Sequence, residues 1–419
     1  MSESQNDAPA SARSTKNAGV KVDPAYVKTF IENIFISDMH AARVLSLSNG
    51  VVGVLHAAAL AIHAIGQAYA KVANIKPKSG VKQVDRLLSN AGFDMSVVIK
   101  PWVRFVVGVR KEIVVALDWT DFEKDDHTTL CAYLVTSHGR ATPLAWKTVK
   151  KSTLKGTRNN HEYELVELLH EFIDGDVEVV LLADRGFGDH KLYDLLQLLG
   201  WDFVIRFRGC IGVQSSAGET RAAEDWVPAN GRATMLRDVA VTDDRAKVPA
   251  VVVVRAPKMK EAWCLATTLS TRKASEVVKL YGKRFSIEET FRDEKNLHFG
   301  MGLSATHIRD AARRDRLLLL AAIAHALLTL LGAASEEAGL DRYLKVNTVK
   351  RRTHSLYRQG LYWYDGIPTM REDWLRPLMV AFDRIVREQA VLHEVLGIIY
   401  YLRGCLRAST CRAPTSGRR

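Results

Sequence analysis

The chain has 419 residues, of which 47% are hydrophobic, so it can build a large core without covalent staples. Lys and Arg outnumber Asp and Glu by 59 to 47, and the net charge of +12 favours an anionic partner without naming it. The five cysteines have neither the spacing of a zinc site nor that of a disulfide framework, which argues against a stapled secreted domain and favours reduced thiols in the cytosol.

The N-terminal part is predicted to be a tail followed by helices. Residues 1–23 lack the apolar core of a secretory signal, and we expect a disordered tail there. Residues 24–105 have helical patterning with short breaks, and we expect a helical DNA-binding domain. Lys82 and Arg86 lie four residues apart on one helical face, where they could contact a phosphate backbone or be solvated.

Two apolar stretches, residues 51–70 and 317–334, carry no charged side chain and are long enough to raise the question of a membrane span. Charged helices flank both stretches, and a protein of this size needs an apolar helix at its centre. We therefore expect buried helices and no membrane partner. The histidines within these stretches, His56, His63 and His325, are predicted to be satisfied core residues rather than metal ligands.

The middle of the chain is predicted to be α/β. Residues 106–208 contain three β-rich runs, then a helix, a strand, a helix and a strand, which is the order of a ribonuclease H-like core. Residues 209–270 are β-rich and are expected to form an insertion. Residues 271–335 complete the core, beginning with one long helix from about Lys273, and residues 336–419 form a basic helical C-terminal region.

Two aspartates are each predicted to close a buried strand of this core. Asp118 follows the run from Ile113 to Leu117, and Asp184 follows the strand that ends at Ala183. Phosphoryl transfer with two metal ions requires carboxylates from separate elements to converge, because hard cations prefer oxygen ligands. An aspartate after a strand also often caps a turn, so either residue alone is ambiguous.

A third carboxylate lies in the helix that starts near Lys273. At about 100° per residue, Tyr281, Arg284, Glu288 and Lys295 fall on one narrow face of that helix. The alternative interpretation is a charged solvent face, with Arg284 and Glu288 as an i,i+4 ion pair.

These four residues have the spacing of the YREK signature, and the chain resembles the insertion-sequence-four family of bacterial DDE transposases. The resemblance extends to DWTD at Asp118, to ADRGF at Asp184, to GWDFVIRFRG from Gly200 and to VKQVDRLLSN from Val81. It covers roughly residues 27–361 and is closest to the transposon-ten transposase subgroup.

The resemblance implies a catalytic triad of Asp118, Asp184 and Glu288 that binds two Mg²⁺ ions, for which Mn²⁺ substitutes. Tyr281, Arg284 and Lys295 would then bind DNA phosphates near the cut. Trp263 would stack on a flipped base, although a core tryptophan on a strand is the alternative. Arg206 and Arg208 match residues that contact transposon ends, although a solvated strand edge would explain them too.

The implied function is cut-and-paste transposition. The protein would bind terminal inverted repeats as a homodimer on double-stranded DNA, cleave through a hairpin intermediate and join the 3′ ends to target DNA, in the bacterial cytoplasm at the nucleoid. Two alternatives stay open: a nuclease of the same fold without strand transfer, and a non-catalytic DNA-binding regulator derived from a transposase.

Overall fold

The computed structural model describes residues 22–242, 244–296 and 300–397. Most of the predicted N-terminal tail, Cys405 and Cys411 therefore lie outside the described residues. Within them, Cys131, Cys210 and Cys264 are free thiols, as expected.

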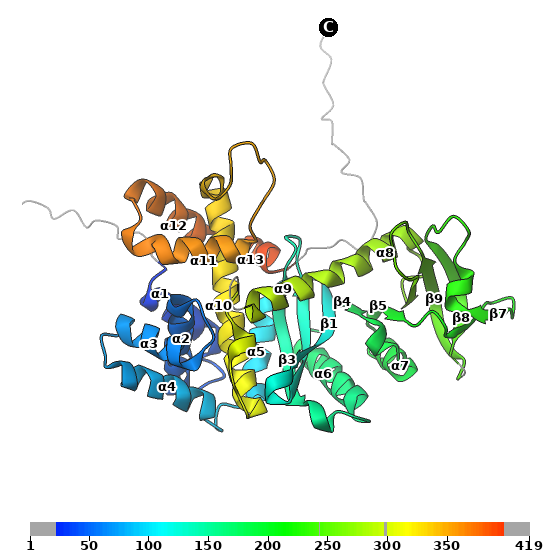
Figure 1. Cartoon of the computed structure of the whole chain (residues 1–419), viewed down its shortest axis with the longest axis horizontal. Helices are drawn as coiled ribbons and strands as arrows, with labels where there is room; N and C mark the ends of the chain where they lie inside the picture. The colour runs from blue at the N-terminus through cyan, green and yellow to red at the C-terminus, as the bar shows by residue number, and fades with distance from the viewer. Residues whose placement is uncertain (1–21, 243, 297–299, 398–419) are drawn as a thin grey trace, which may run out of the picture.

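The described part of the chain forms a ten-stranded sheet with helices around it (Figure 1). The strand order is β3-β2-β1-β4-β5-β10-β9-β8-β6-β7. The strands are β1 (Glu112–Phe122), β2 (His127–Val135), β3 (Ala141–Lys150), β4 (Glu178–Ala183), β5 (Asp202–Phe207), β6 (Gly212–Gln214), β7 (Thr220–Ala222), β8 (Thr234–Val241), β9 (Ala246–Val254) and β10 (Trp263–Thr267).

The first five strands form the ribonuclease H-like core, which confirms the predicted α/β fold class. β1, β2 and β3 are antiparallel neighbours, whereas β1 pairs with β4 and β4 pairs with β5 in parallel. β4 reads EVVLLA and is buried along all but its first residue, as expected for a parallel strand that is covered on both faces.

The β-rich segment that follows β5 continues this sheet. β10 pairs antiparallel with β5, so that Leu265 lies opposite Arg206, and β9, β8, β6 and β7 follow outward. The predicted β insertion is thus connected to the core by backbone hydrogen bonds. In Figure 1 it forms the green end of the molecule.

The helices lie before, between and after the strands. They are α1 (Pro24–Phe35), α2 (Ala41–Ala57), α3 (Ile62–Val72), α4 (Pro77–Ser89), α5 (Met95–Val107), α6 (Arg158–Phe172), α7 (His190–Leu198), α8 (Ala274–Gly282), α9 (Ser286–Lys295), α10 (Ala311–Glu337), α11 (Leu356–Gly366), α12 (Glu372–Arg387) and α13 (Gln389–Leu396). Short 3₁₀ turns are η1 (Glu123–Asp125), η2 (Lys151–Thr153), η3 (Arg185–Phe187), η4 (Ala223–Trp226), η5 (Lys283–Phe285), η6 (Leu303–Ala305), η7 (Leu340–Leu344) and η8 (Ile367–Thr369).

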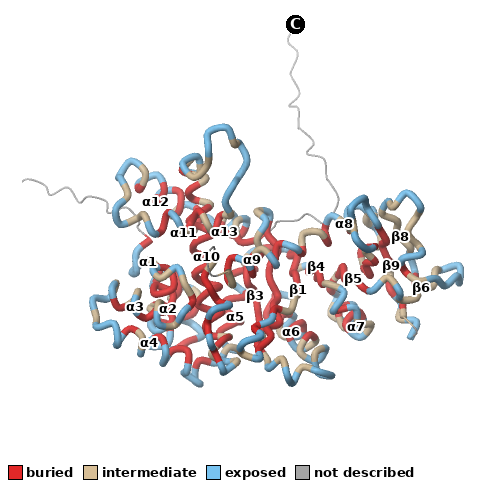
Figure 2. The backbone as a smooth tube through the Cα atoms, viewed as in Figure 1, coloured by how far each residue is buried: buried red, intermediate tan, exposed pale blue. Residues whose placement is uncertain are grey.

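α10 is the central helix of the protein. It begins after Asp310, whose side chain accepts a hydrogen bond from the Arg313 backbone N–H at 2.8 Å. It packs against β3 and against helices from both ends of the chain, namely α2, α11 and α12. It is long and apolar enough to cross a membrane, but 94% of its most apolar window is buried inside the protein (Figure 2), so it is a core helix, as predicted.

The other apolar stretch, residues 51–70, is divided between α2 and α3, which meet at an angle of 99°. His56, near the end of α2, and His63, in α3, are exposed, so the prediction that they are core residues was wrong. Both sit where these helices present a face to solvent. His325 is buried in α10, but neither of its ring nitrogens has a hydrogen-bond partner.

Candidate functional site

Asp118 and Asp184 lie where two parallel strands separate. The pairing of β1 with β4 ends at Leu117 opposite Ala183, and each aspartate is the next residue. Asp184 follows the end of β4, as predicted. Asp118 does not close its strand, because β1 continues to Phe122 through its pairing with β2. The prediction of a strand end at Asp118 is therefore corrected, while its position at the edge of the parallel core is retained.

The turn after β4 fixes the Asp184 side chain. Asp184 Oδ1 accepts a hydrogen bond from the Gly186 backbone N–H at 2.7 Å and caps η3. This is the capping role that the sequence left open. The Asp184 side chain therefore shapes the turn that follows β4.

The helix that carries the third carboxylate is broken. Instead of one long helix from about Lys273, the chain forms α8, the 3₁₀ turn η5 and then α9. Gly282, a weak helix former, immediately precedes η5. α9 packs against β1, β2 and β3, which places Glu288 near Asp118.

Arg284 in η5 connects two of the three carboxylates. Its Nη1 donates to Asp118 Oδ2 at 3.1 Å, and its Nη2 donates to Glu288 Oε1 at 2.8 Å. The Arg284 side chain is only 6% exposed, Asp118 is 17% exposed and Glu288 is 49% exposed. Asp184 also acts electrostatically on both Asp118 and Arg284. Two of the three predicted acidic residues therefore contact one guanidinium group, and the third interacts with it electrostatically.

The pKa of Asp118 shows that burial at this position disfavours its ionised form. Burial raises the pKa of Asp118 to about 6, while Arg284 opposes this shift and the negative charges of Asp184 and Glu288 add to it. A divalent cation would act in the same direction as Arg284, because it favours the ionised carboxylate.

The donor set fits a hard divalent cation in its chemistry but is not a preformed cage. Three carboxylates supply the oxygen ligands that Mg²⁺ prefers, and the buried guanidinium between them shows that the position stabilises positive charge. Within the described ranges, however, no group of three or more His, Cys, Asp or Glu side chains is arranged to hold a metal ion. Binding of a metal ion by all three carboxylates therefore requires side-chain movement.

Tyr281 lies in the last turn of α8, and Lys295 is the last residue of α9. Lys295 Nζ donates to Thr120 Oγ1 at 2.8 Å and to the Asp121 carbonyl at 2.7 Å, so it contacts β1 beside Asp118. Tyr281 is buried and its ring packs 5.0 Å from Trp263. The structure thus brings Arg284, Glu288 and Lys295 to β1, whereas it brings Tyr281 to the first residue of β10.

Trp263 forms an aromatic cluster with the η5 segment. It is partly exposed, and its ring lies 6.0 Å from that of Phe285, which is 40% exposed. The Arg284 guanidinium lies 4.9 Å from the Phe285 ring centre. Sequence reasoning missed Phe285, although its position next to Arg284 was a usable signal.

The predicted basic contacts lie in two places. Arg206 on β5 forms an ion pair with Glu261 at 2.8 Å, and Arg208 is exposed just beyond that strand. Arg185, missed by the sequence analysis, is exposed in η3 and pairs with the same Glu261 at 3.2 Å. Lys82 and Arg86 are exposed on α4, in the N-terminal helices, and are not part of the carboxylate site.

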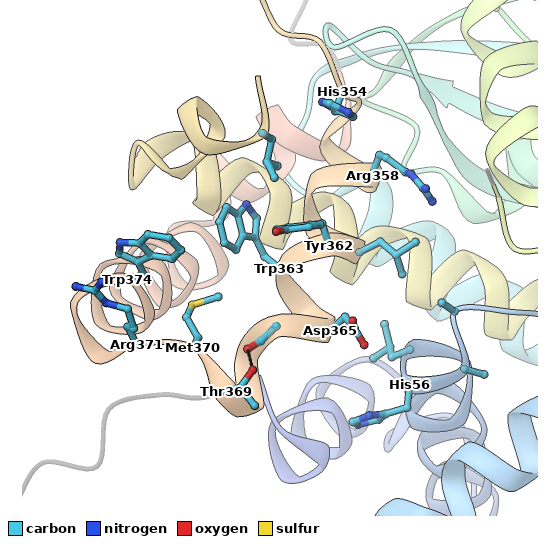
Figure 3. Close-up of a pocket in the computed structure, with 16 residues that line it drawn as sticks. His56, His354, Arg358, Tyr362, Trp363, Asp365, Thr369, Met370, Arg371 and Trp374 are labelled. Carbon is cyan, nitrogen blue, oxygen red and sulfur yellow. Dashed lines mark hydrogen bonds between the residues drawn. The ribbon is translucent and has the colours of Figure 1, made fainter. Parts of the chain in front are cut away.

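A pocket of about 880 Å³ lies elsewhere, between the end of α2 and the helices α11 and α12. Figure 3 shows Tyr362 and Trp363 of α11 and Trp374 of α12 around it, with His56 on the α2 side. None of the three carboxylates lines this pocket. The candidate site lies instead where the parallel pairing of β1 with β4 ends.

Comparison with known proteins identifies the central part of the chain. A search of curated proteins found no match. The family model described as "Transposase DDE domain" matches residues 110–327, which is just over half of the chain and includes all three carboxylates, η5 and Lys295. The ribonuclease H-like strand order and this match agree, and the chain belongs to the transposase family that this DDE domain defines.

Proposed function

We propose that this DDE transposase performs cut-and-paste transposition with Asp118, Asp184 and Glu288 as its catalytic and metal-binding residues. The observation that carries the proposal is that Asp118 and Glu288 both contact the Arg284 guanidinium, which also interacts electrostatically with Asp184, where the parallel pairing of β1 and β4 ends. Acidic groups brought together from two strands and a helix are costly unless a cation binds them. The transposon-ten subgroup of the insertion-sequence-four family supplies the expected reaction course.

The reaction would proceed by successive in-line attacks at phosphorus. Water attacks the phosphodiester at the transposon end, and the broken P–O bond leaves a 3′ hydroxyl. That hydroxyl attacks the opposite strand and forms a hairpin, which a second water opens, and the 3′ end then attacks target DNA. Two Mg²⁺ ions, or Mn²⁺ in their place, would supply charge stabilisation for the attacking and leaving oxygens. The protein's part is to hold the carboxylates and the DNA in register.

The surrounding residues support this assignment of roles. Partly exposed Trp263, beside exposed Phe285, has a ring surface near the carboxylates on which a base turned out of the hairpin could stack. Tyr281, Arg284 and Lys295 would position the phosphate near the cut, whereas Arg206, Arg208, Lys82 and Arg86 would contact the transposon end further away. Two copies would bind two inverted-repeat ends, in the bacterial cytoplasm.

A cleavage and joining assay tests the proposal. Wild type, Asp118→Asn and Asp184→Asn are incubated with end-bearing DNA and Mg²⁺, and nicking, hairpins and joined products are resolved on denaturing gels. Asp176→Asn is the matched control, because Asp176 precedes β4 whereas Asp184 follows it, and Asp176 forms only an exposed ion pair with Lys111. We expect losses on the order of 10³-fold for the two site variants, as several kcal/mol of charge stabilisation disappears, and none for the control.

The outcomes separate the alternatives. Equal cleavage by wild type and Asp118→Asn would overturn the carboxylate assignment. Hydrolysis of a pre-cut end without joining to a plasmid would indicate a nuclease. Specific binding without cleavage in Mg²⁺ or Mn²⁺ would indicate a non-catalytic regulator.

A further inference from the structure

Arg284 uses both arms of its guanidinium group on the carboxylates of the candidate site. One arm binds Asp118 Oδ2 and the other binds Glu288 Oε1. The second oxygen of Asp118, Oδ1, accepts the Trp119 backbone N–H at 2.9 Å. Each oxygen of Asp118 therefore already has a donor.

A divalent ion and this guanidinium group compete for the same oxygens. A metal ion needs carboxylate lone pairs directed at it, and one lone pair on each of Asp118 Oδ2 and Glu288 Oε1 already accepts a hydrogen bond from Arg284. Two cations placed a few ångströms apart in a buried site also repel each other strongly. Metal binding through Asp118 Oδ2 and Glu288 Oε1 is therefore disfavoured while Arg284 stays in place.

The surroundings of Arg284 allow it to leave. Arg284 Nε is buried without a hydrogen-bond partner, so no bond holds that part of the side chain in place. The guanidinium lies against the exposed ring of Phe285, and its partner Glu288 is about half exposed. Phe285, which is 40% exposed, therefore places solvent-accessible surface beside the Arg284 guanidinium.

We propose that Arg284 is an exchangeable counter-ion that couples metal binding to DNA binding. It neutralises Asp118 and Glu288 until a divalent ion takes its place, and it then binds a DNA phosphate. This inference rests on the proposed function, because it takes these carboxylates as metal ligands. Because coupling between two ligands is reciprocal, DNA should raise metal affinity by the same factor by which metal raises DNA affinity.

Mn²⁺ binding measures the coupling without any reaction. Free Mn²⁺ is quantified by electron paramagnetic resonance in the full-length protein, with and without a pre-cut duplex end that lacks the 3′ hydroxyl and so cannot be joined. For wild type we expect DNA to tighten Mn²⁺ binding about tenfold. For Arg284→Gln we expect Mn²⁺ to bind about tenfold more tightly without DNA, and DNA to add less than about twofold.

Two further variants make the result decisive. Lys295→Gln removes one positive charge from the same segment, but Lys295 contacts Thr120 and the Asp121 carbonyl rather than the carboxylates. If Lys295→Gln and Arg284→Gln gain the same Mn²⁺ affinity, the displacement of Arg284 by the metal ion is overturned. The gain would then come from the loss of one positive charge near the site, whichever residue carries it. Asp118→Asn should lose Mn²⁺ binding, and if it does not, the proposed function fails.

If Asp118→Asn loses Mn²⁺ while Arg284→Gln binds it as wild type does, only the present inference fails. Thermal melting of each variant, followed by circular dichroism, establishes that it is folded before Mn²⁺ is added. An additional variant, Arg284→Met, has a similar stem and no charge, and should match Arg284→Gln. A divergence between these two variants would overturn the proposal, because it would show that the loss of the guanidinium is not the cause.

Discussion

Two Arg–Asp ion pairs, whose aspartates both lie on the β1–β2 hairpin, differ in how far solvent reaches them. Arg284 pairs with Asp118 in the middle of β1, and Arg314 pairs with Asp125 in the turn that follows β1. Arg314 is 0% exposed and Asp125 is 5% exposed, whereas Asp118 is 17% exposed and the second partner of Arg284, Glu288, is 49% exposed. One pair is closed by the protein and the other borders solvent.

The closed pair ties the central helix to the sheet. Arg314, in the first turns of α10, also donates from Nε to His127 Nδ1 at 3.1 Å and lies 3.9 Å from the centre of the Phe122 ring. Asp125 accepts the Ile308 backbone N–H at 3.2 Å. Arg314 and Asp125 thus have several fixed neighbours, and we propose partner exchange only for Arg284. Solvent access, rather than the residues themselves, distinguishes the structural pair from the candidate catalytic one.

The largest expected change in the free energy of unfolding comes from breaking the closed pair of Arg314 and Asp125. Arg314→Met should lower the free energy of unfolding by about 3–5 kcal/mol, because it leaves Asp125 buried without its cation. Arg284→Gln should lower it by less, about 1–3 kcal/mol, because Glu288 is 49% exposed and Gln can still donate a hydrogen bond to Asp118, which is 17% exposed. Urea denaturation measures both, and equal losses would contradict the distinction between the two pairs.

A smaller change in the free energy of unfolding is expected for His325, another buried polar residue of α10. His325 is buried against the Tyr357 ring with both ring nitrogens unpartnered, so His325→Phe should keep the packing and raise the free energy of unfolding by about 1–3 kcal/mol. Burial lowers the pKa of His325 to about 3. Because the unfolded chain takes up this proton more readily, wild type should lose stability as the pH falls below about 6.5, and the advantage of His325→Phe should grow.

Denaturation at pH 7.5 and at pH 5 tests this prediction. The control is His63→Phe, because His63 is exposed on α3 and its substitution should change neither the stability nor its pH dependence. A destabilised His325→Phe protein would show that this histidine has a polar partner in solution.

The smallest effect on folding concerns the exposed residues of α4. Replacing Lys82 and Arg86 together by Gln should change the free energy of unfolding by no more than about 0.5 kcal/mol. If each contacts one phosphate, the dependence of DNA affinity on salt should weaken by roughly 0.9 in slope per residue. Binding assays at several salt concentrations measure this slope, and an unchanged slope would place both residues in solvent, away from DNA.

The sequence was sufficient for the core because the core depends on local patterns. Runs such as the one from Val179 to Ala183 are apolar without alternation, which indicates strands that are buried on both faces. Their order with the intervening helices predicted the ribonuclease H-like fold. The spacing from Tyr281 to Lys295 likewise predicted that these residues share one helical face, and the family resemblance implied that Glu288 joins the two aspartates.

The features that the sequence did not predict depend on contacts between residues that are far apart in the chain. β1 continues past Asp118 because β2 pairs with it, and nothing local in DWTD marks that partner. The turn at η5 and the bridge from Arg284 to Asp118 likewise depend on tertiary packing, whereas the sequence indicated only the i,i+4 pair with Glu288. The exposure of His56 and His63 was missed because apolar neighbours do not show which face of a helix meets solvent. The roles of the site residues stay predictions.

The unbroken sheet limits how the protein can adapt to a substrate. Trp263 begins β10, which is hydrogen-bonded to β5, and β5 to β4, the strand that leads into Asp184. A hinge between the aromatic cluster and the carboxylates would break this ladder of backbone bonds. The distance from Trp263 to Asp184 is therefore set by the fold, so a DNA end that contacted both would have to adapt its own shape to the protein, and the energy of that adaptation would depend on its sequence.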